Sequence, residues 1–275
     1  MTIHIDTYKN NMTHYLLIAA VAILPVFLLW IYIWRRDARP EPLGQLLKAT
    51  WWGVLIAIPA VLVETVIEII LFGNGGEGSG WMDNVVSAFC VAAIPEETLK
   101  LTALWLVVRK NPYFDEHFDG IVYAVCVSLG FAGIENVCYL FSNTDSWLSI
   151  GIMRALLAVP GHYAFAVFMG YYFARYYFVK QSLWNAIRIL LVPVLAHGTY
   201  DAIVMNMSMN EYLVFPMLGV LIIFCVNMHK VCKKRIMSQA ALDEAETRRD
   251  RHTNEQELQA HHEPDEPERG WSYDK

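Results

Sequence analysis

Charge is scarce along most of this sequence. Only 17% of its 275 residues are charged, whereas soluble domains average about a quarter. Many of these charges crowd into residues 231–275, so the rest of the chain is poorer still. The mean hydropathy is correspondingly positive, at +0.33. This composition argues against an ordinary soluble domain and favours a membrane protein.

Several familiar motifs are also absent. The five cysteines are scattered at or within apolar segments without a Cys-x-x-Cys pair, which argues against a disulfide framework or a thiolate zinc site. We expect them to be small buried apolar groups. The sequence contains no Gly-x-Ser-x-Gly, no His-Glu-x-x-His and no paired membrane aspartates. The hydrolase classes that depend on those motifs are therefore excluded.

Seven apolar segments are long enough to cross a bilayer as helices. A spanning helix needs about 20 apolar residues, whereas a barrel strand needs about 10 with strict alternation. The sequence therefore predicts an all-α, polytopic membrane helix bundle. The predicted spans are residues 15–34, 48–72, 84–108, 118–141, 150–175, 184–206 and 212–231.

Basic residues are missing from every second loop. The loops after the second, fourth and sixth spans carry no Lys or Arg. Because Lys and Arg accumulate on the cytoplasmic side, this asymmetry predicts an outer N-terminus and a cytoplasmic C-terminus. The basic residues after the odd-numbered spans are Arg35, Arg36, Arg39, Arg109, Lys110, Lys180, Lys230, Lys233, Lys234 and Arg235.

The chain divides into a membrane domain and a tail. We expect residues 1–235 to form the multi-span domain. Residues 236–275 are charged, contain proline and lose all apolar periodicity. Such segments do not bury enough apolar surface to fold alone, so we expect a cytoplasmic tail that is disordered or forms a short exposed helix.

When residues within a turn of a cytoplasmic end are left out, ionisable residues lie inside five of the seven predicted spans. Each costs about 2.5 to 3.5 kcal/mol on insertion scales, so such residues usually face a shared interior and mark a functional site. The first and last spans contribute none, which predicts one polar interior built by spans two to six. The residues are Glu64, Glu68, Glu96, Glu97, Lys100, Glu135, Arg154, His162, His197 and Asp201.

Their spacing and depth predict a common site. Glu96 and Lys100 are four residues apart, so they share a helical face and partly neutralise each other. At a rise of 1.5 Å per residue, Glu96, Glu135, His162 and His197 lie roughly 9 to 18 Å from the outer ends of their spans. We therefore expect them to converge between the midplane and the outer leaflet.

The backbone near these residues is expected to be irregular. Pro95 and Pro160 each remove a helical hydrogen bond just before an ionisable residue, which favours a kink or a break. Gly130 and Gly133 lack side chains on the span that carries Glu135, which permits close helix approach. Within the membrane, backbone groups that lose a helical hydrogen bond must find a partner in the protein or in water, so we expect a protein-lined or water-filled cavity here.

The predicted cavity supports two ways of activating water. A buried carboxylate could act as a general base, or His and Glu could bind a divalent metal such as Zn²⁺. An Asp one turn from a His, as in His197-x-x-x-Asp201, could orient the imidazole or help to hold an oxyanion. Two other classes remain open: an ion- or proton-coupled transporter, and a non-catalytic seven-span binding protein.

Four motifs resemble those of the PrsW family of intramembrane proteases, which is related to the CAAX prenyl endoproteases. Glu96-Glu97-Thr-Leu-Lys100 is similar to the family's Glu-Glu-x-x-Lys motif, and residues 131–136 are similar to its Phe-x-x-x-Glu-Asn segment. The stretch from Arg154 to His162 and the sequence 197–201 resemble its remaining polar motifs. The resemblance covers about residues 84–205.

The resemblance implies an endopeptidase in a bacterial plasma membrane, acting on membrane-anchored proteins such as anti-sigma factors. Its expected partners are the bilayer and such a protein, and no nucleic acid. The family is catalogued with metalloproteases, whereas its CAAX relatives suggest a glutamate-based mechanism. The predicted catalytic residues are Glu96, Glu97, Glu135, His162 and His197, with Lys100, Asn136, Arg154 and Asp201 supporting them. A metal-dependent mechanism would use Glu135, His162 and His197 as ligands.

Overall fold

The computed structural model describes residues 2–73 and 80–260, and side chains within 12–73 and 80–256. Within these ranges every regular element is helical, which confirms the all-α prediction. The elements are α1 (Thr2–Trp34), α2 (Leu43–Phe72), α3 (Trp81–Val86), η1 (Ser87–Ala93), α4 (Ile94–Val108), α5 (Asp119–Ser142), α6 (Trp147–Met153), η2 (Arg154–Ala158), α7 (Val159–Ala174), η3 (Arg175–Val179), α8 (Leu183–Met207), η4 (Glu211–Leu213) and α9 (Val214–Ala260).

Six stretches of helix are long and apolar enough to cross a membrane. They correspond to six of the seven predicted spans. The remaining prediction, residues 84–108, is helical as α3, η1 and α4, but its three charged residues make it less apolar than the others. The six are Met12–Trp34, Leu43–Phe72, Asp119–Ser142, Trp147–Val179, Leu183–Met207 and Glu211–Gln256.

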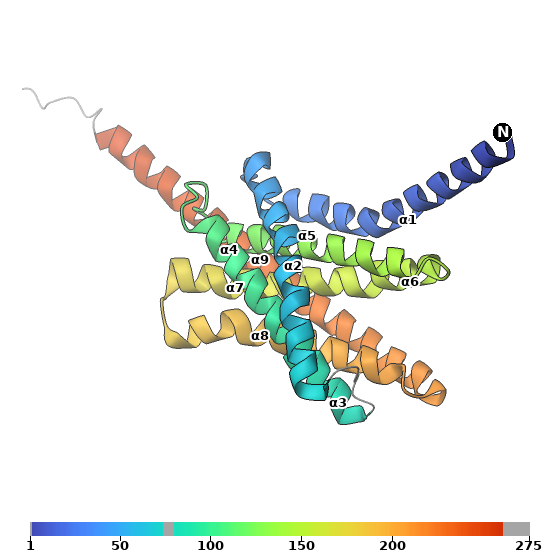
Figure 1. Ribbon diagram of the computed structural model, residues 1–275. Helices are drawn as coiled ribbons and strands as arrows, with labels where there is room; N and C mark the ends of the chain where they lie inside the picture. The colour runs from blue at the N-terminus through green and yellow to red at the C-terminus, as the bar shows by residue number, and fades with distance from the viewer. Residues whose placement is uncertain (1, 74–79, 261–275) are drawn as a thin grey trace, which may run out of the picture.

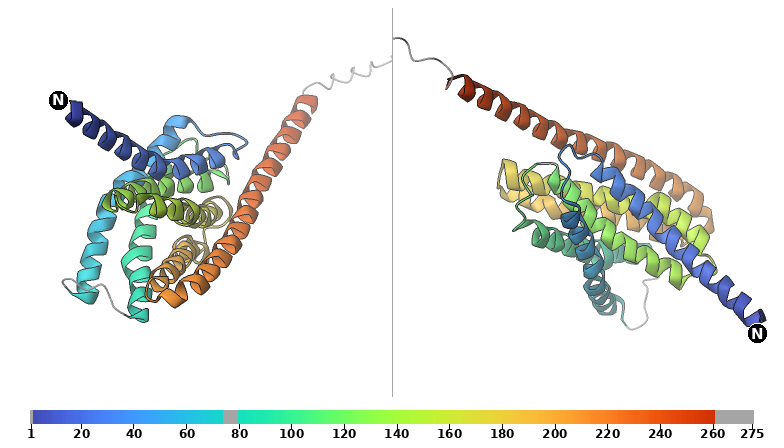
Figure 2. Two further views of the ribbon diagram at one scale, coloured as in Figure 1. Left: turned by 90° about the vertical axis from the view of Figure 1, so that its right-hand side faces the viewer. Right: turned by 90° about the horizontal axis from the view of Figure 1, so that it is seen from above.

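Helices α5 and α7 form the centre of the bundle (Figure 1). Their side chains are the most thoroughly buried, and α1 and α2 pack against α5 while α8 and α9 pack against α7. Helices α2 and α4 lie side by side and cross the others steeply (Figures 1 and 2). The predicted site residues lie where α4, α5, α7 and α8 meet.

Two glycines permit the close contact of α2 with α5. A Cβ atom on Gly53 would lie 1.9 Å from the carbonyl oxygen of Val127, and one on Gly130 would lie 2.0 Å from that of Thr50. Only residues without side chains allow the two backbones to approach this closely. The expected close approach at Gly130 is therefore present.

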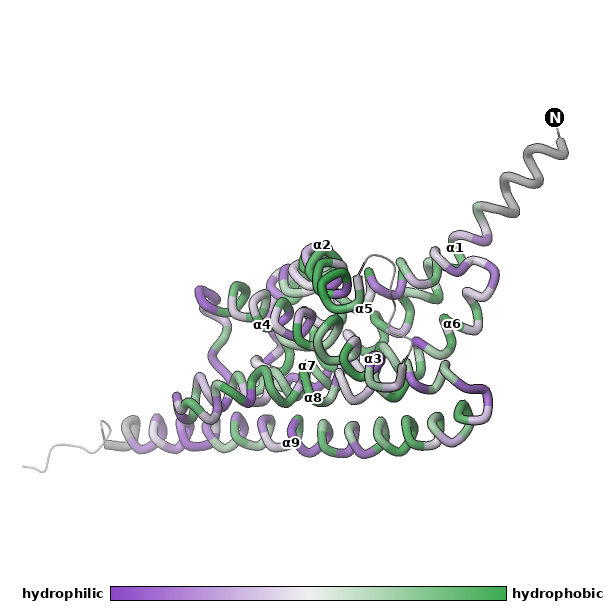
Figure 3. Tube along the Cα trace, turned by 60° about the horizontal axis from the view of Figure 1, so that its bottom comes forward, coloured by the Kyte–Doolittle hydropathy of each residue, from purple (hydrophilic) through white to green (hydrophobic). Residues whose placement is uncertain are grey.

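The tail begins as a continuation of α9. This helix runs straight along one side of the bundle and extends beyond it (Figure 2), and its polar residues become more frequent toward its C-terminal end (Figure 3). Residues 236–260, for which disorder or a short exposed helix was expected, are helical. The Asp243 carboxylate accepts hydrogen bonds from the backbone N–H groups of His117 (2.8 Å) and Phe118 (2.9 Å), just before α5. Residues 261–275 lie outside the described part.

Candidate active site

The predicted site residues converge on one large cavity. Its volume is about 880 Å³, and α2, η1, α4, α5, η2, α7 and α8 all contribute to its wall. Behind this wall Glu97 and Lys100 are almost completely buried, with 0% and 1% of their surface exposed. The ionisable residues that line the cavity are Glu64, Glu96, Glu135, Arg154, His162, His197 and Asp201.

A π-helical segment precedes each of two site-bearing helices. Segment η1 ends at Ala93, two residues before Pro95, and η2 ends at Ala158, two residues before Pro160. The irregular backbone expected near the prolines is therefore present as a wider helical turn, and neither helix is interrupted there. Such π-bulges are frequent at functional sites, and here each one comes directly before the helix that carries site residues.

The Lys100 ammonium lies at the centre of the polar cluster. Its Nζ donates to Glu96 Oε2 (2.9 Å) and Glu97 Oε1 (2.8 Å), and it lies 3.2 Å from His162 Nδ1. The Phe131 ring covers it, with Nζ 4.4 Å from the ring centroid. Buried charges need partners and hydrogen bonds, and Lys100 provides both for two carboxylates at once.

His162 connects this centre to Glu135. Because the ammonium has only protons to donate, Nδ1 of His162 acts as the acceptor, and Nε2 carries the proton. Nε2 then donates to Glu135 Oε2 at 2.8 Å. The guanidinium of Arg154 lies 3.1 Å from the same oxygen. Glu135 is therefore held between an imidazole and a guanidinium.

His197 lies between carboxylates. Its Nδ1 is 2.9 Å from Glu97 Oε1, and its Nε2 is 3.0 Å from Asp201 Oδ2 and 4.0 Å from Glu96 Oε2. The ring stacks on Phe165, with centroids 4.7 Å apart and planes 18° apart. The structure thus brings His197 and Asp201 together in the orientation that their four-residue spacing suggested.

Arg154 and Asn136 link the site to neighbouring helices. Arg154 Nε donates to Asn136 Oδ1 (2.5 Å), and its guanidinium carbon lies 4.1 Å from the centroid of the Tyr139 ring. Asn136 Nδ2 donates in turn to the carbonyl oxygen of Ala22 on α1 (3.1 Å). These contacts fix Arg154 beside Glu135.

The donor set fits a divalent metal. Glu96, His162 and His197 each offer one ligand atom, and these atoms all lie within 4.8 Å of one another. Two histidines and a glutamate form a common catalytic zinc set. The group contains Glu96 in place of the predicted ligand Glu135, whose contacts are with His162 and Arg154.

Two aromatic residues contact the predicted site residues, although neither was predicted to belong to the site. Phe131 covers Lys100 and Phe165 stacks on His197. Phe165 is three residues beyond His162 and Phe131 is four before Glu135, so helical spacing was the signal that could have placed both on the site's faces. Of the two acidic residues on α2, Glu64 lines the cavity whereas Glu68 is not part of its wall.

Comparison with known proteins identifies the family. The model of the PrsW family intramembrane metalloproteases matches residues 41–227. Protease PrsW of Clostridioides difficile (strain 630) is 33% identical over 222 residues, which are 78% of this chain and 89% of that protein. Protease PrsW of Bacillus subtilis (strain 168) is 34% identical over 203 residues, 72% and 88% of the two chains. No solved structure matches.

The matched region contains the whole polar cluster, from Glu64 on α2 to Asp201 on α8. A third relative, Protease PrsW of Geobacillus kaustophilus (strain HTA426), is 36% identical over 188 residues, 67% of this chain and 78% of that protein. The chain therefore belongs to the PrsW family of intramembrane metalloproteases.

Proposed function

We propose that this peptidase hydrolyses a peptide bond in a membrane-anchored protein, within the cavity bordered by Glu96, His162 and His197. The observation that carries the proposal is the buried cluster around Lys100, which opens into a cavity of about 880 Å³ among membrane helices. Charges so deep in a membrane domain are retained for function. A cavity of this size has room for water and an extended segment of substrate.

Glu96 is the proposed general base. It lines the cavity, whereas Glu97 lies behind it without lining the wall. Lys100 holds one oxygen of Glu96 at 2.9 Å, which fixes the carboxylate while its other oxygen has no hydrogen bond in the described residues. A positioned carboxylate of this kind takes a proton from water as the water attacks the carbonyl carbon.

His197 and Asp201 are the proposed oxyanion-stabilising pair. Asp201 and Glu97 flank the His197 ring, one at each nitrogen, and hold it at the cavity wall. A fixed imidazole N–H at the cavity wall stabilises the negative charge that develops on the carbonyl oxygen. Glu97 thus has a positioning role, because it contacts both Lys100 and His197.

His162 and Glu135 are the proposed remaining contacts to water or metal. In the metal-dependent alternative, where Glu96 and His197 are ligands instead of base and oxyanion donor, Glu96, His162 and His197 would hold the metal that the family implies. A bound divalent ion would polarise a carbonyl and lower the pKa of water. Glu135 would orient His162 through its hydrogen bond to Nε2, as carboxylates do for many metal-binding histidines. Arg154 and Asn136 keep Glu135 in place.

We further propose that residues 84–108 form a seventh span, with the N-terminus outside and the C-terminus in the cytoplasm. The loop charges support this orientation, and the charges of α4 are paired inside the bundle rather than exposed to lipid. The relatives are bacterial, which supports a bacterial plasma membrane. Anti-sigma factors with one membrane span are the proposed substrates, cut near the outer leaflet.

Co-expression with a candidate substrate tests this function. We expect Glu135→Gln and His197→Ala to abolish the appearance of the cleaved fragment, which is followed by immunoblot. Glu68→Gln is the matched control, since Glu68 lies on α2 but does not line the cavity. Undiminished cleavage by both site variants, at wild-type membrane abundance, would refute the assignment.

A further inference from the structure

One carboxylate in the wall of the catalytic cavity has no role in the proposed chemistry. Glu64 on α2 lines this wall. Among the described residues it has no hydrogen-bond partner and no ion-pair partner, so its charge is not balanced by a direct contact. The other four site carboxylates each contact a cation or a histidine, in the pairs Glu96–Lys100, Glu97–Lys100, Glu135–Arg154 and Asp201–His197.

Helical register places Glu64 on the face of α2 that borders the cavity. It follows Ala57 by seven residues and Val61 by three, and all three line the wall. Among the charged groups, Glu96 and Glu135 act on Glu64 most strongly, and both repel it. Glu64 lies about 12 Å from the C-terminal end of α2. This depth is within the range expected for the catalytic residues, so Glu64 faces the space in which the peptide bond is cut.

The site carries a surplus of negative charge. Five carboxylates lie in the cavity wall or directly behind it, whereas the cations are Lys100, Arg154 and, when protonated, two histidines. A bound divalent metal does not remove the surplus, because histidines that bind a metal are neutral while the ion supplies two charges. At least one negative charge therefore lacks a counterion. An unpaired carboxyl in an apolar site is neutralised by a proton, and an arriving ammonium or guanidinium replaces that proton.

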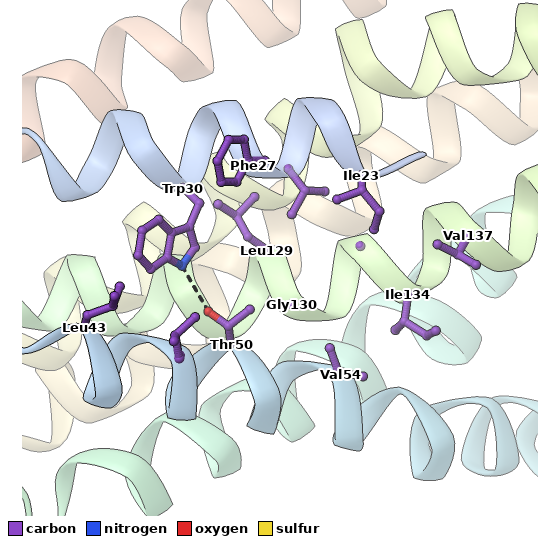
Figure 4. Close-up of a pocket in the computed structure, with 13 residues that line it drawn as sticks. Ile23, Phe27, Trp30, Leu43, Thr50, Val54, Leu129, Gly130, Ile134 and Val137 are labelled. Atoms are coloured by element: carbon purple, nitrogen blue, oxygen red, sulfur yellow. Dashed lines mark hydrogen bonds between the residues drawn. The ribbon is translucent and has the colours of Figure 1, made fainter. Parts of the chain in front are cut away.

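The cavity is open to the bilayer along the C-terminal half of α2. The N-terminal half is held against its neighbours, and Trp30 Nε1 on α1 donates to Thr50 Oγ1 on α2 at 3.0 Å (Figure 4). Farther along α2, Ile58 and Leu62 line the cavity, yet 67% and 64% of their surfaces are exposed. A substrate segment that enters from the bilayer on this side therefore meets the face of α2 that carries Glu64.

We propose that Glu64 binds a Lys or Arg side chain of the substrate and so selects substrates with a basic residue in the outer part of their membrane span. The inference rests on the proposed function, because it requires that the cavity holds the substrate. The basic group supplies the missing positive charge, and its apolar stem lies along the apolar wall of α2. Glu64 is thus a specificity-determining residue, whereas Glu96 remains the base.

Paired reporters test this selection. A co-expressed single-span protein carries Lys at one position in the outer part of its span, and each position is compared with a version that carries Gln there. We expect the wild-type protein to cut the best Lys reporter at least about tenfold faster than its Gln partner, because the buried carboxylate then has a counterion. Glu64→Gln should remove this difference. Glu68→Gln, a matched change on the same helix outside the cavity wall, should preserve it.

Charge exchange separates recognition from a structural role. Glu64→Lys should reverse the preference, so that a reporter with Glu at the selected position is cut faster than the one with Lys. Equal cleavage of all Lys and Gln reporters by the wild-type protein, or a preference that survives Glu64→Gln, would overturn the inference and leave the proposed function intact. Failure of the proposed function looks different, because no reporter is then cut at all.

A crosslink tests the contact without cleavage. The Glu96→Gln protein, which retains Glu64, is mixed with the Lys reporters in liposomes and treated with a lipid-soluble carbodiimide. This reagent takes up water as it joins a carboxyl to a neighbouring amine, so an amide forms where the two groups are in contact. Peptide mass spectrometry should find the amide between Glu64 and the reporter lysine, and the Gln reporters should give none. Amides confined to other carboxyls, such as Glu68, would overturn the inference.

Discussion

Lys100→Met would leave two carboxylates buried without their counterion. The ammonium lies 2.9 Å from Glu96 and 2.8 Å from Glu97, with 1% of the Lys100 surface exposed. Removing one partner of a buried ion pair destabilises a protein by about 3 to 5 kcal/mol. For a chain of this size, that corresponds to a fall in melting temperature of roughly 6 to 20 °C.

Thiol accessibility during heating measures this effect. Contrary to the burial expected for all five cysteines, Cys90 and Cys138 are exposed, so the assay uses a background in which both are replaced by serine. Cys126 and Cys232 are buried, so a maleimide dye reacts with them only as the helices separate. Lys180→Met, at an exposed position, should melt like the wild-type protein. Adding Glu97→Gln to Lys100→Met should restore part of the loss, because only one unpaired carboxylate then remains. A melting temperature for Lys100→Met within 2 °C of the wild type, below the lower limit of about 6 °C, would refute the central role given to Lys100.

Three further predictions concern the scaffold. Gly130→Ala should destabilise the protein by about 1 to 3 kcal/mol because its Cβ would meet a backbone carbonyl at 2.0 Å, whereas Gly133→Ala should melt normally in the same assay. Asp243→Ala removes the acceptor of two backbone N–H groups, so limited proteolysis should cut the end of α9 faster; an unchanged rate would contradict its anchoring role. Burial raises the pKa of Asp37 and of Glu41 above their ordinary values of 3.8 and 4.5. The folded protein then holds protons that the unfolded chain has lost, so stability should fall as pH rises above these values. Asp37→Asn with Glu41→Gln should flatten that fall in melts recorded across the pH range.

The lengths of the apolar segments predicted most of the fold. Each predicted span coincides with helical structure in the described residues, because a helix that crosses lipid needs a long apolar run regardless of its neighbours. The continuation of α9 was less predictable, since its charged sequence has no apolar periodicity. Its packing depends on tertiary contacts, such as that of Asp243 with the start of α5.

Register along the spans predicted which residues meet but not their contacts. Position along the spans predicted that Glu96 and Glu135 lie at the same depth. It does not predict how each helix is rotated about its axis, and this rotation decides which side chains meet. The structure places Glu96 beside both histidines and turns Glu135 toward Arg154. The prolines predicted a kink or a break because a missing hydrogen bond often kinks a helix. A π-helical turn is an alternative that sequence spacing does not distinguish.

Hydrolysis by the purified protein is the most direct test of the proposed mechanism. A membrane-anchored substrate is incubated with the protein in liposomes containing ¹⁸O-labelled water, and the products are analysed by mass spectrometry. The wild-type protein should create a new carboxyl terminus that carries the label. Glu96→Gln should lower the rate at least about 100-fold, as expected when a general base is lost, while the protein remains folded by the thiol assay. A folded Glu96→Gln variant that cleaves at the wild-type rate would contradict the account.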